Sequence, residues 1–111
     1  MKIEEVIKKF SMYAQQFDKT APNKNWYVGI TQQTPITLRK KQHEYEKNIR
    51  CQHFSPLITA KNKEDALRVE KELEKAGFAI HEKDLEPIQE TASTQENTSV
   101  YIFQAVKLKK N

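Results

Sequence analysis

Apolar side chains near the amino terminus recur at the spacing of one helix face. They are Ile3, Val6, Ile7, Phe10, Tyr13, Ala14 and Phe17. Because positions i, i+3, i+4 and i+7 lie on one side of an α-helix, the pattern predicts an amphipathic helix over residues 3–17. The apolar stripe has two interpretations: it packs on the core of the domain, or it binds a partner.

Four later segments have the composition of β-strands. Residues 25–31 and 98–106 concentrate aromatic and β-branched side chains, and the second segment is the strongest strand pattern in the chain. Residues 54–60 contain Pro56, which cannot donate a backbone hydrogen bond and therefore favours an edge position. Residues 78–81 form a brief fourth candidate.

Two further helices are predicted between these strands. Pro35 is typical of a first helical turn and begins a helix over residues 35–49. Asn62 caps a second helix over residues 63–76, and Gly77 directly after it suits the left-handed residue that ends a helix. The first of these helices has an apolar back and a cationic front. Its back consists of Leu38, Tyr45 and Ile49, and its bases are Arg39, Lys40, Lys41, Lys47 and Arg50.

The order of these elements predicts a small α+β domain over residues 1–111, an antiparallel β-sheet packed with about three α-helices. The polar and acidic residues 82–97 are expected to form a long mobile loop. No stretch approaches the roughly 20 apolar residues that a bilayer requires, so no membrane partner is expected. Cys51 is the only cysteine and the amino terminus has no continuous apolar run, which favours a reducing, cytoplasmic location.

Charge is distributed unevenly along the chain. The net charge is +4, but residues 82–97 hold five acidic residues and one lysine, so the remainder is more basic than the total indicates. A polyanionic partner such as nucleic acid is therefore plausible. A charged helix face is also common as a solvated surface, and this alternative stays open for the helix over residues 35–49.

One acid on the helix over residues 63–76 lies among apolar positions. At about 100° per residue, Glu70 falls inside the arc formed by Ala66 and Leu73. Burying a carboxylate alone is costly, so such a group must be paired, bind a metal or open into a cleft. A structural ion pair with Arg39 or a lysine is one interpretation, and a functional carboxylate is the other.

Several of these residues occur in an order that is typical of one enzyme family. Tyr27-Val28-Gly29 ends a strand, Arg39 and His43 lie one turn apart on the next helix, and Ala66-Leu67 precede Glu70 on a later one. In these features the chain resembles the GIY-YIG nuclease family over about residues 26–77. The resemblance implies a GIY-YIG-like core over about residues 25–106.

The family's first strand motif, Gly-x-Tyr, has a similar segment at the carboxyl end of this chain. Ser99-Val100-Tyr101 resembles it, with Ser99 in the place of the glycine. The resemblance therefore implies the family's sheet in permuted order, with residues 98–106 beside residues 25–31. This pairing would bring Tyr101 to the site.

The resemblance also implies a reaction, the hydrolysis of DNA phosphodiester bonds. Glu70 would hold one Mg²⁺, and Arg39 would grip the scissile phosphate. Tyr27 would orient or activate the attacking water, and Tyr101 and His43 would assist proton transfer. Lys40 and Lys47 would flank the site and contact nucleic acid, with DNA favoured over RNA.

Two other functions are weighed against this one. A degenerate relative could bind nucleic acid without cleaving it, and a non-catalytic protein-interaction domain could use the same fold. A zinc site from Cys51, His53, His43 and His81 lacks the paired spacing of such sites. Cys51 and His53 as a nucleophilic pair lack a third group that orients the base.

Overall fold

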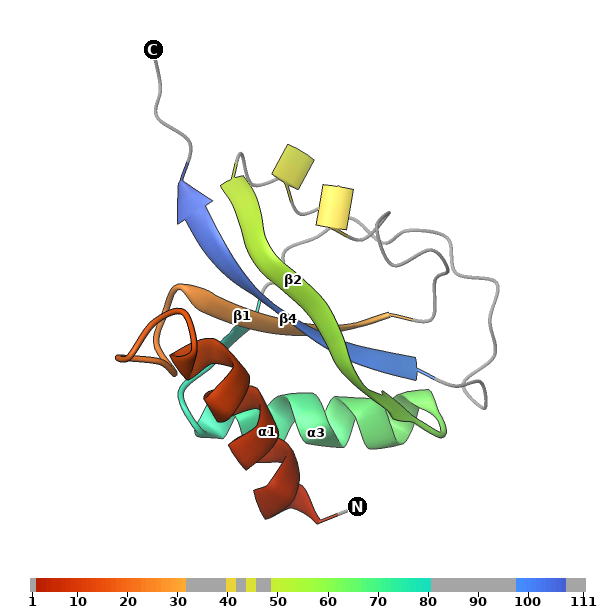
Figure 1. Cartoon of the computed structure of the whole chain (residues 1–111). Helices are drawn as coiled ribbons and strands as arrows, with labels where there is room; N and C mark the ends of the chain where they lie inside the picture. The colour runs from red at the N-terminus through yellow and green to blue at the C-terminus, as the bar shows by residue number, and fades with distance from the viewer. Residues whose placement is uncertain (1, 32–39, 42–43, 46–48, 81–97, 108–111) are drawn as a thin grey trace.

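The computed structural model describes residues 2–31, 40–41, 44–45, 49–80 and 98–107 of the 111-residue chain. This part of the chain contains two long helices and four strands, which confirms the α+β class (Figure 1). The elements are α1 (Ile3–Gln15), β1 (Trp26–Thr31), β2 (Ile49–Ala60), α3 (Lys63–Lys75), β3 (Ala79–Ile80) and β4 (Thr98–Lys107). Residues 40–41 and 44–45 are also helical. The expected acidic loop over residues 82–97 lies outside the described residues.

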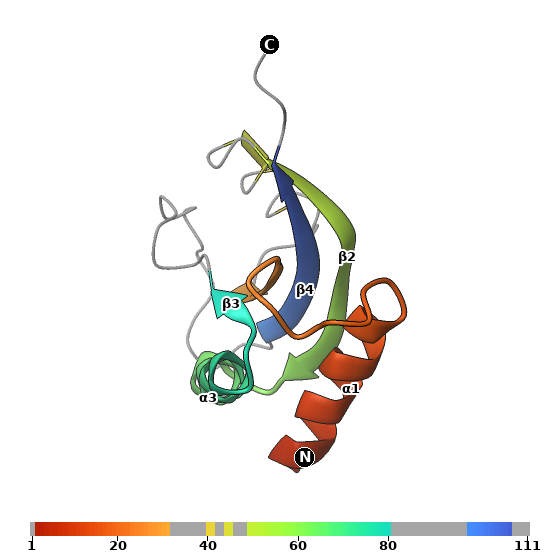
Figure 2. The ribbon, with the colours of Figure 1, turned by 90° about the vertical axis from the view of Figure 1, so that its left-hand side faces the viewer.

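The four strands form one sheet in the order β2-β4-β1-β3. The expected neighbourhood of the last strand is confirmed, because β4 is antiparallel to β1 and Tyr101 lies opposite Gly29. β3 runs parallel to β1, so the sheet is mixed, whereas an antiparallel sheet was expected. Pro56 lies on the edge strand β2, as its missing donor predicts. Figure 2 shows that β4 and β2 curve side by side, with α1 and α3 at the lower end of the molecule.

β2 begins earlier than the sequence predicts. Ile49 was expected to end a helix, but it starts the strand and is buried together with Cys51. Two bulges interrupt the pairing with β4, between Gln52 and Ser55 and between Pro56 and Ile58. At each bulge the side chains that follow change to the opposite face of the sheet. The regular alternation of apolar and polar residues that would predict the strand is therefore interrupted.

One face of the sheet carries the larger hydrophobic cluster, which is shared with both helices. From α1 it includes Val6, Phe10 and Ala14, so the first of the two interpretations of the amphipathic stripe holds for these residues. β1 contributes Trp26 and Val28, as alternation along a strand requires. α1 ends at Gln15, two residues earlier than expected.

The boundaries of α3 follow from its capping residues. The side chain of Asn62 accepts a hydrogen bond of 2.9 Å from the Asp65 backbone N–H. At the other end Gly77 has φ +117°, and the Phe78 N–H donates to the Leu73 carbonyl at 3.2 Å. This is the Schellman arrangement, and it turns the chain so that Phe78 enters the core.

Candidate nucleic-acid interface

Tyr27 and Tyr101 lie on the second face of the sheet, opposite the face that the two long helices cover. Along β1 and β4 the two tyrosines alternate with Trp26, Val28 and Ile102, whose side chains belong to the cluster on the helical side. The cluster on the second face contains Ile49, Cys51, Tyr101 and Phe103, with Tyr27, Phe54 and Ala105 packed against it. The two tyrosines from the two ends of the chain are therefore brought to one face.

Tyr27 is half-buried and its ring stacks on Phe103 with the ring centres 5.5 Å apart. Burial raises the pKa of the Tyr27 phenol above its ordinary value of 10.0. A phenol with a raised pKa holds its proton at neutral pH, so in this structure Tyr27 suits hydrogen-bond donation better than proton abstraction.

The Tyr101 side chain is fully buried, whereas a residue that contacts a substrate needs an exposed surface. Its exposed fraction is 0%, and its ring stacks on Phe54 at 4.8 Å. Phe54 also stacks on Phe103 at 5.6 Å, so the aromatic rings of this face form one continuous stack. In this arrangement Tyr101 packs in the core of the second face.

Glu70 occupies the buried stripe of α3, as its position in the sequence predicts. Its exposed fraction is 7%, and Ala66 and Leu73 on the same stripe belong to the helical-side cluster. The Oε2 atom of Glu70 exposes less than 1 Å². Glu70 therefore comes from an element on the helical side, whereas Tyr27 and Tyr101 come from the other face.

These residues do not fit a bound Mg²⁺ as they stand. Mg²⁺ in proteins keeps several water molecules and needs oxygen ligands that are open to them. Glu70 offers one carboxylate, one oxygen of which is enclosed. The part of the chain that the structure describes holds no group of three or more histidine, cysteine, aspartate or glutamate residues able to hold a metal.

Three of the expected site residues, Arg39, His43 and Lys47, lie outside the described residues. Lys40 is described and half-buried, and its carbonyl lies 4.0 Å from the Cys51 sulfur.

The predicted orientation of Tyr45 is wrong. It was expected on the apolar back of its helix, but its exposed fraction is 90%. The expectation failed because it treated Ile49 as part of the same helix, and Ile49 belongs to β2.

Around Tyr45 the structure forms a shallow pocket of about 540 Å³. The described residues that line it are Lys41, Glu44, Tyr45, Ile49 and Arg50, and we call this surface the Tyr45 patch. Lys41 and Arg50 are exposed. The Glu44 carboxylate accepts a hydrogen bond of 2.9 Å from the backbone N–H of Cys51, which turns the acid towards the strand. The sequence indicated the bases of this region, but no local signal indicated that an aromatic ring projects among them.

Cys51 and His53 point to structural roles. Burial raises the pKa of the Cys51 thiol to about 12, and Glu44 adds to the shift, so the reactive thiolate is disfavoured. His53 has φ +54° within the first bulge of β2, and its ring stacks on Phe17 with the centres 3.7 Å apart. The Tyr13 hydroxyl donates to the His53 carbonyl at 2.7 Å. Through these contacts β2 packs against the end of α1.

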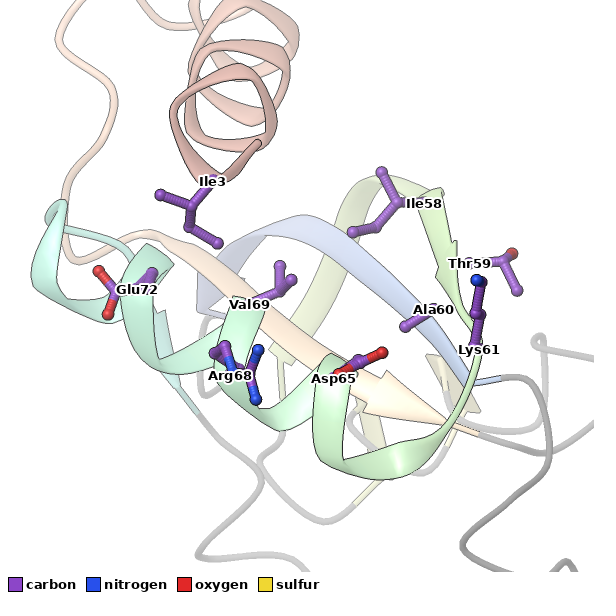
Figure 3. A pocket seen from close by; sticks show the side chains of 9 residues that line it. All are labelled: Ile3, Ile58, Thr59, Ala60, Lys61, Asp65, Arg68, Val69 and Glu72. Carbon is purple, nitrogen blue, oxygen red and sulfur yellow. The ribbon is translucent and has the colours of Figure 1, made fainter. Parts of the chain in front are cut away.

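A larger groove of about 700 Å³ lies between α1, α3 and the end of β2 (Figure 3). Ile3, Ile58 and Val69 come from these three elements and form its apolar floor. Its charged lining residues are of both signs: Lys61, Asp65, Arg68 and Glu72. This groove has no excess of positive charge, unlike the Tyr45 patch.

The fold and these surfaces define a small α+β domain with a basic, aromatic patch at one end of its sheet. Comparison with protein-family models, with curated proteins and with solved structures found no match to the chain. The resemblance to the GIY-YIG nucleases therefore stays a prediction from the sequence. None of the helices in the described ranges is both long and apolar enough to cross a membrane.

Proposed function

We propose that this protein is a nucleic-acid-binding domain that contacts the phosphate backbone through the Tyr45 patch. The observation that carries the proposal is the composition of the patch, in which the exposed cations Lys41 and Arg50 line the same shallow pocket as an aromatic ring that is 90% exposed. Phosphate contacts from lysine and arginine supply most of the affinity of sequence-independent nucleic-acid binding. The positive excess of the chain outside its acidic segment supports the same partner.

A third cation lies close to the same surface. Lys107 is opposite Ile49 in the register of β2 and β4, and residues directly opposite on antiparallel strands share a face. Because Ile49 lines the patch, the exposed Lys107 side chain starts beside it. The acid in the lining, Glu44, is engaged by the Cys51 backbone, which reduces its opposition to a phosphate.

Salt dependence of binding tests the proposal. Fluorescence anisotropy would follow a labelled single strand of about 12 nucleotides at ionic strengths from about 50 mM upward. With three phosphate contacts, a plot of log affinity against log salt has an expected slope of about −2. The double variant Lys41→Ala/Arg50→Ala reduces the slope to about −1. The matched control is Lys71→Ala, an exposed lysine of α3, which leaves the slope unchanged.

Cleavage is a separate outcome of the same preparation. The proposal is binding without cleavage, since Glu70 is enclosed and Tyr27 and Tyr101 come from the other face of the sheet. Incubation of nicked, branched and duplex DNA with Mg²⁺ is expected to leave the strands intact. Cleavage that is lost in Glu70→Gln would overturn this part of the proposal and support the Mg²⁺-dependent nuclease that the resemblance implies.

A second candidate function is protein binding, the alternative that the sequence leaves open. The observation that favours it is the groove between α1, α3 and β2, with its apolar floor and charged lining. The two candidates separate cleanly in the binding assay. Failure of the wild-type protein to bind any DNA or RNA at about 50 mM salt would remove the first candidate and leave the second.

A further inference from the structure

The ring of Tyr45 is the most exposed of the large hydrophobic side chains in the described residues, since Met12, Phe17 and Leu67 are 45–55% exposed and Tyr45 is 90% exposed. A single exposed aromatic residue is ordinary on a protein surface. The residues around Tyr45 distinguish it from such a case. The same shallow pocket is lined by Lys41 and Arg50, and Ile49 forms an apolar floor beside the ring.

This arrangement separates two kinds of contact. The cations can neutralise phosphates, which are the same in single and double strands. The Tyr45 side chain is 90% exposed, so a nucleobase of any sequence can reach its ring and stack on it. Bases in a duplex already stack on their neighbours and are not free to cover the ring. The combination therefore fits a strand whose bases are unpaired.

We propose that the Tyr45 patch binds single-stranded nucleic acid, with one unpaired base stacked on the Tyr45 ring and the adjacent phosphates held by Lys41 and Arg50. This inference rests on the proposed function and adds the class of strand. Stacking uses the ring and not the hydroxyl, so Tyr45→Phe retains affinity and Tyr45→Ala loses it. Because the side chain is almost fully exposed, neither change disturbs the core.

The test compares three labelled ligands of about 12 nucleotides: a DNA or RNA single strand, the matching duplex, and a strand of abasic sites with the same phosphates. The single strand is expected to bind the full-length protein about tenfold more tightly than the abasic strand. Tyr45→Ala removes most of this difference, and Tyr45→Phe keeps affinity within about twofold of the wild type. Leu67→Ala, a change at an exposed apolar residue of α3 outside the patch, serves as the control and leaves the difference intact.

The outcomes distinguish this inference from the proposed function. Equal, salt-dependent binding of the single strand, the duplex and the abasic strand, unchanged by Tyr45→Ala, would overturn the stacking site and leave phosphate binding standing. Absence of binding to every ligand would overturn both. Thermal unfolding of each variant, followed by the fluorescence of the single tryptophan, establishes that the folded protein is compared in all cases.

Discussion

The two faces of the sheet differ in what covers them and in which groups they bury. The helical side buries aliphatic residues of β1 and β4, together with Trp26, against α1 and α3. The second face buries a stack of aromatic rings around Tyr101, and it also buries Cys51, whose backbone is bonded to Glu44. The helical side is the larger packed cluster and buries the Glu70 carboxylate, whereas the second face carries Tyr101, the Cys51 thiol and the edge of the basic patch. We infer that fold stability depends mainly on the first face, and that binding chemistry is concentrated at the second.

Loss of a buried side chain on the helical side is the largest expected effect. Leu73 is fully buried on α3, so Leu73→Ala is expected to lower the free energy of unfolding by about 2–5 kcal/mol through lost burial and a cavity. The matched control is Leu67→Ala on the same helix, where the side chain is 45% exposed and the expected change is within about 0.5 kcal/mol. Urea unfolding followed by Trp26 fluorescence measures both.

Nucleic-acid binding by Leu73→Ala should match the wild type at temperatures where the variant is folded. The reason is that α3 covers the face opposite the Tyr45 patch. Equal destabilisation by the two leucine variants would show that the helical side is not the main source of stability. A loss of binding by folded Leu73→Ala would show that the two faces are coupled.

Local signals were enough for much of the fold. The caps Asn62 and Gly77 act within a few residues of themselves, so they define α3 without knowledge of the rest of the chain. The strand composition of residues 98–106 was also local, and its partner followed from the similarity of its motif. The start of β2 was missed because its two bulges depend on pairing with β4, a long-range contact that short windows do not record.

In the candidate site, too, the features that follow from local sequence could be predicted, and those that depend on long-range contacts could not. The burial of Glu70 follows from its place among apolar residues of one helix, and the structure agrees. The exposure of Tyr45 could not be derived in this way, because it depends on where the helix ends and β2 begins. The opposite placement of Glu70 and Tyr27 depends on which face α3 covers, and no spacing in the sequence determines that.

Alkaline pH is expected to lower the free energy of unfolding through groups on the second face. The folded pKa of Cys51, about 12, lies above its ordinary value of 9.0, so folding favours the neutral thiol. This contribution to stability is fully present below about pH 9 and is lost as the pH rises towards about 12. Tyr27, whose pKa is also raised by burial, changes stability in the same direction.

The difference in unfolding free energy between the wild type and Cys51→Ala isolates the thiol, because all other titrating groups are shared. That difference is expected to shrink from about pH 9 upward. The rate of reaction of Cys51 with iodoacetamide gives a second measure, with a midpoint near pH 12 in the folded protein. A midpoint near pH 9 in the folded protein would mean that Cys51 is open to solvent.

Acid pH should act on the helical side, and this is the smallest of the expected effects. Asp18, just after α1, accepts hydrogen bonds from the Thr20 hydroxyl at 2.7 Å, from the Asn23 amide at 2.8 Å and from the Trp26 indole N–H at 3.1 Å. The bonds from Thr20, the largest cause, and from Asn23 lower the pKa of Asp18 to about 2 from its ordinary value of 3.8.

The folded pKa of Asp18 is below the unfolded value, so its contribution to stability is present above about pH 4 and is lost as the pH falls towards about 2. Asp18→Asn removes the titration but keeps a side-chain oxygen that can accept the Trp26 N–H. The variant is therefore expected to match the wild type most closely at the acid end of this range and to fall below it near neutrality. Urea unfolding at a series of pH values measures the difference. A constant difference across that range would mean that the Asp18 carboxylate makes no pH-dependent contribution, and that the acid sensitivity of the domain arises away from the contact between α1 and Trp26.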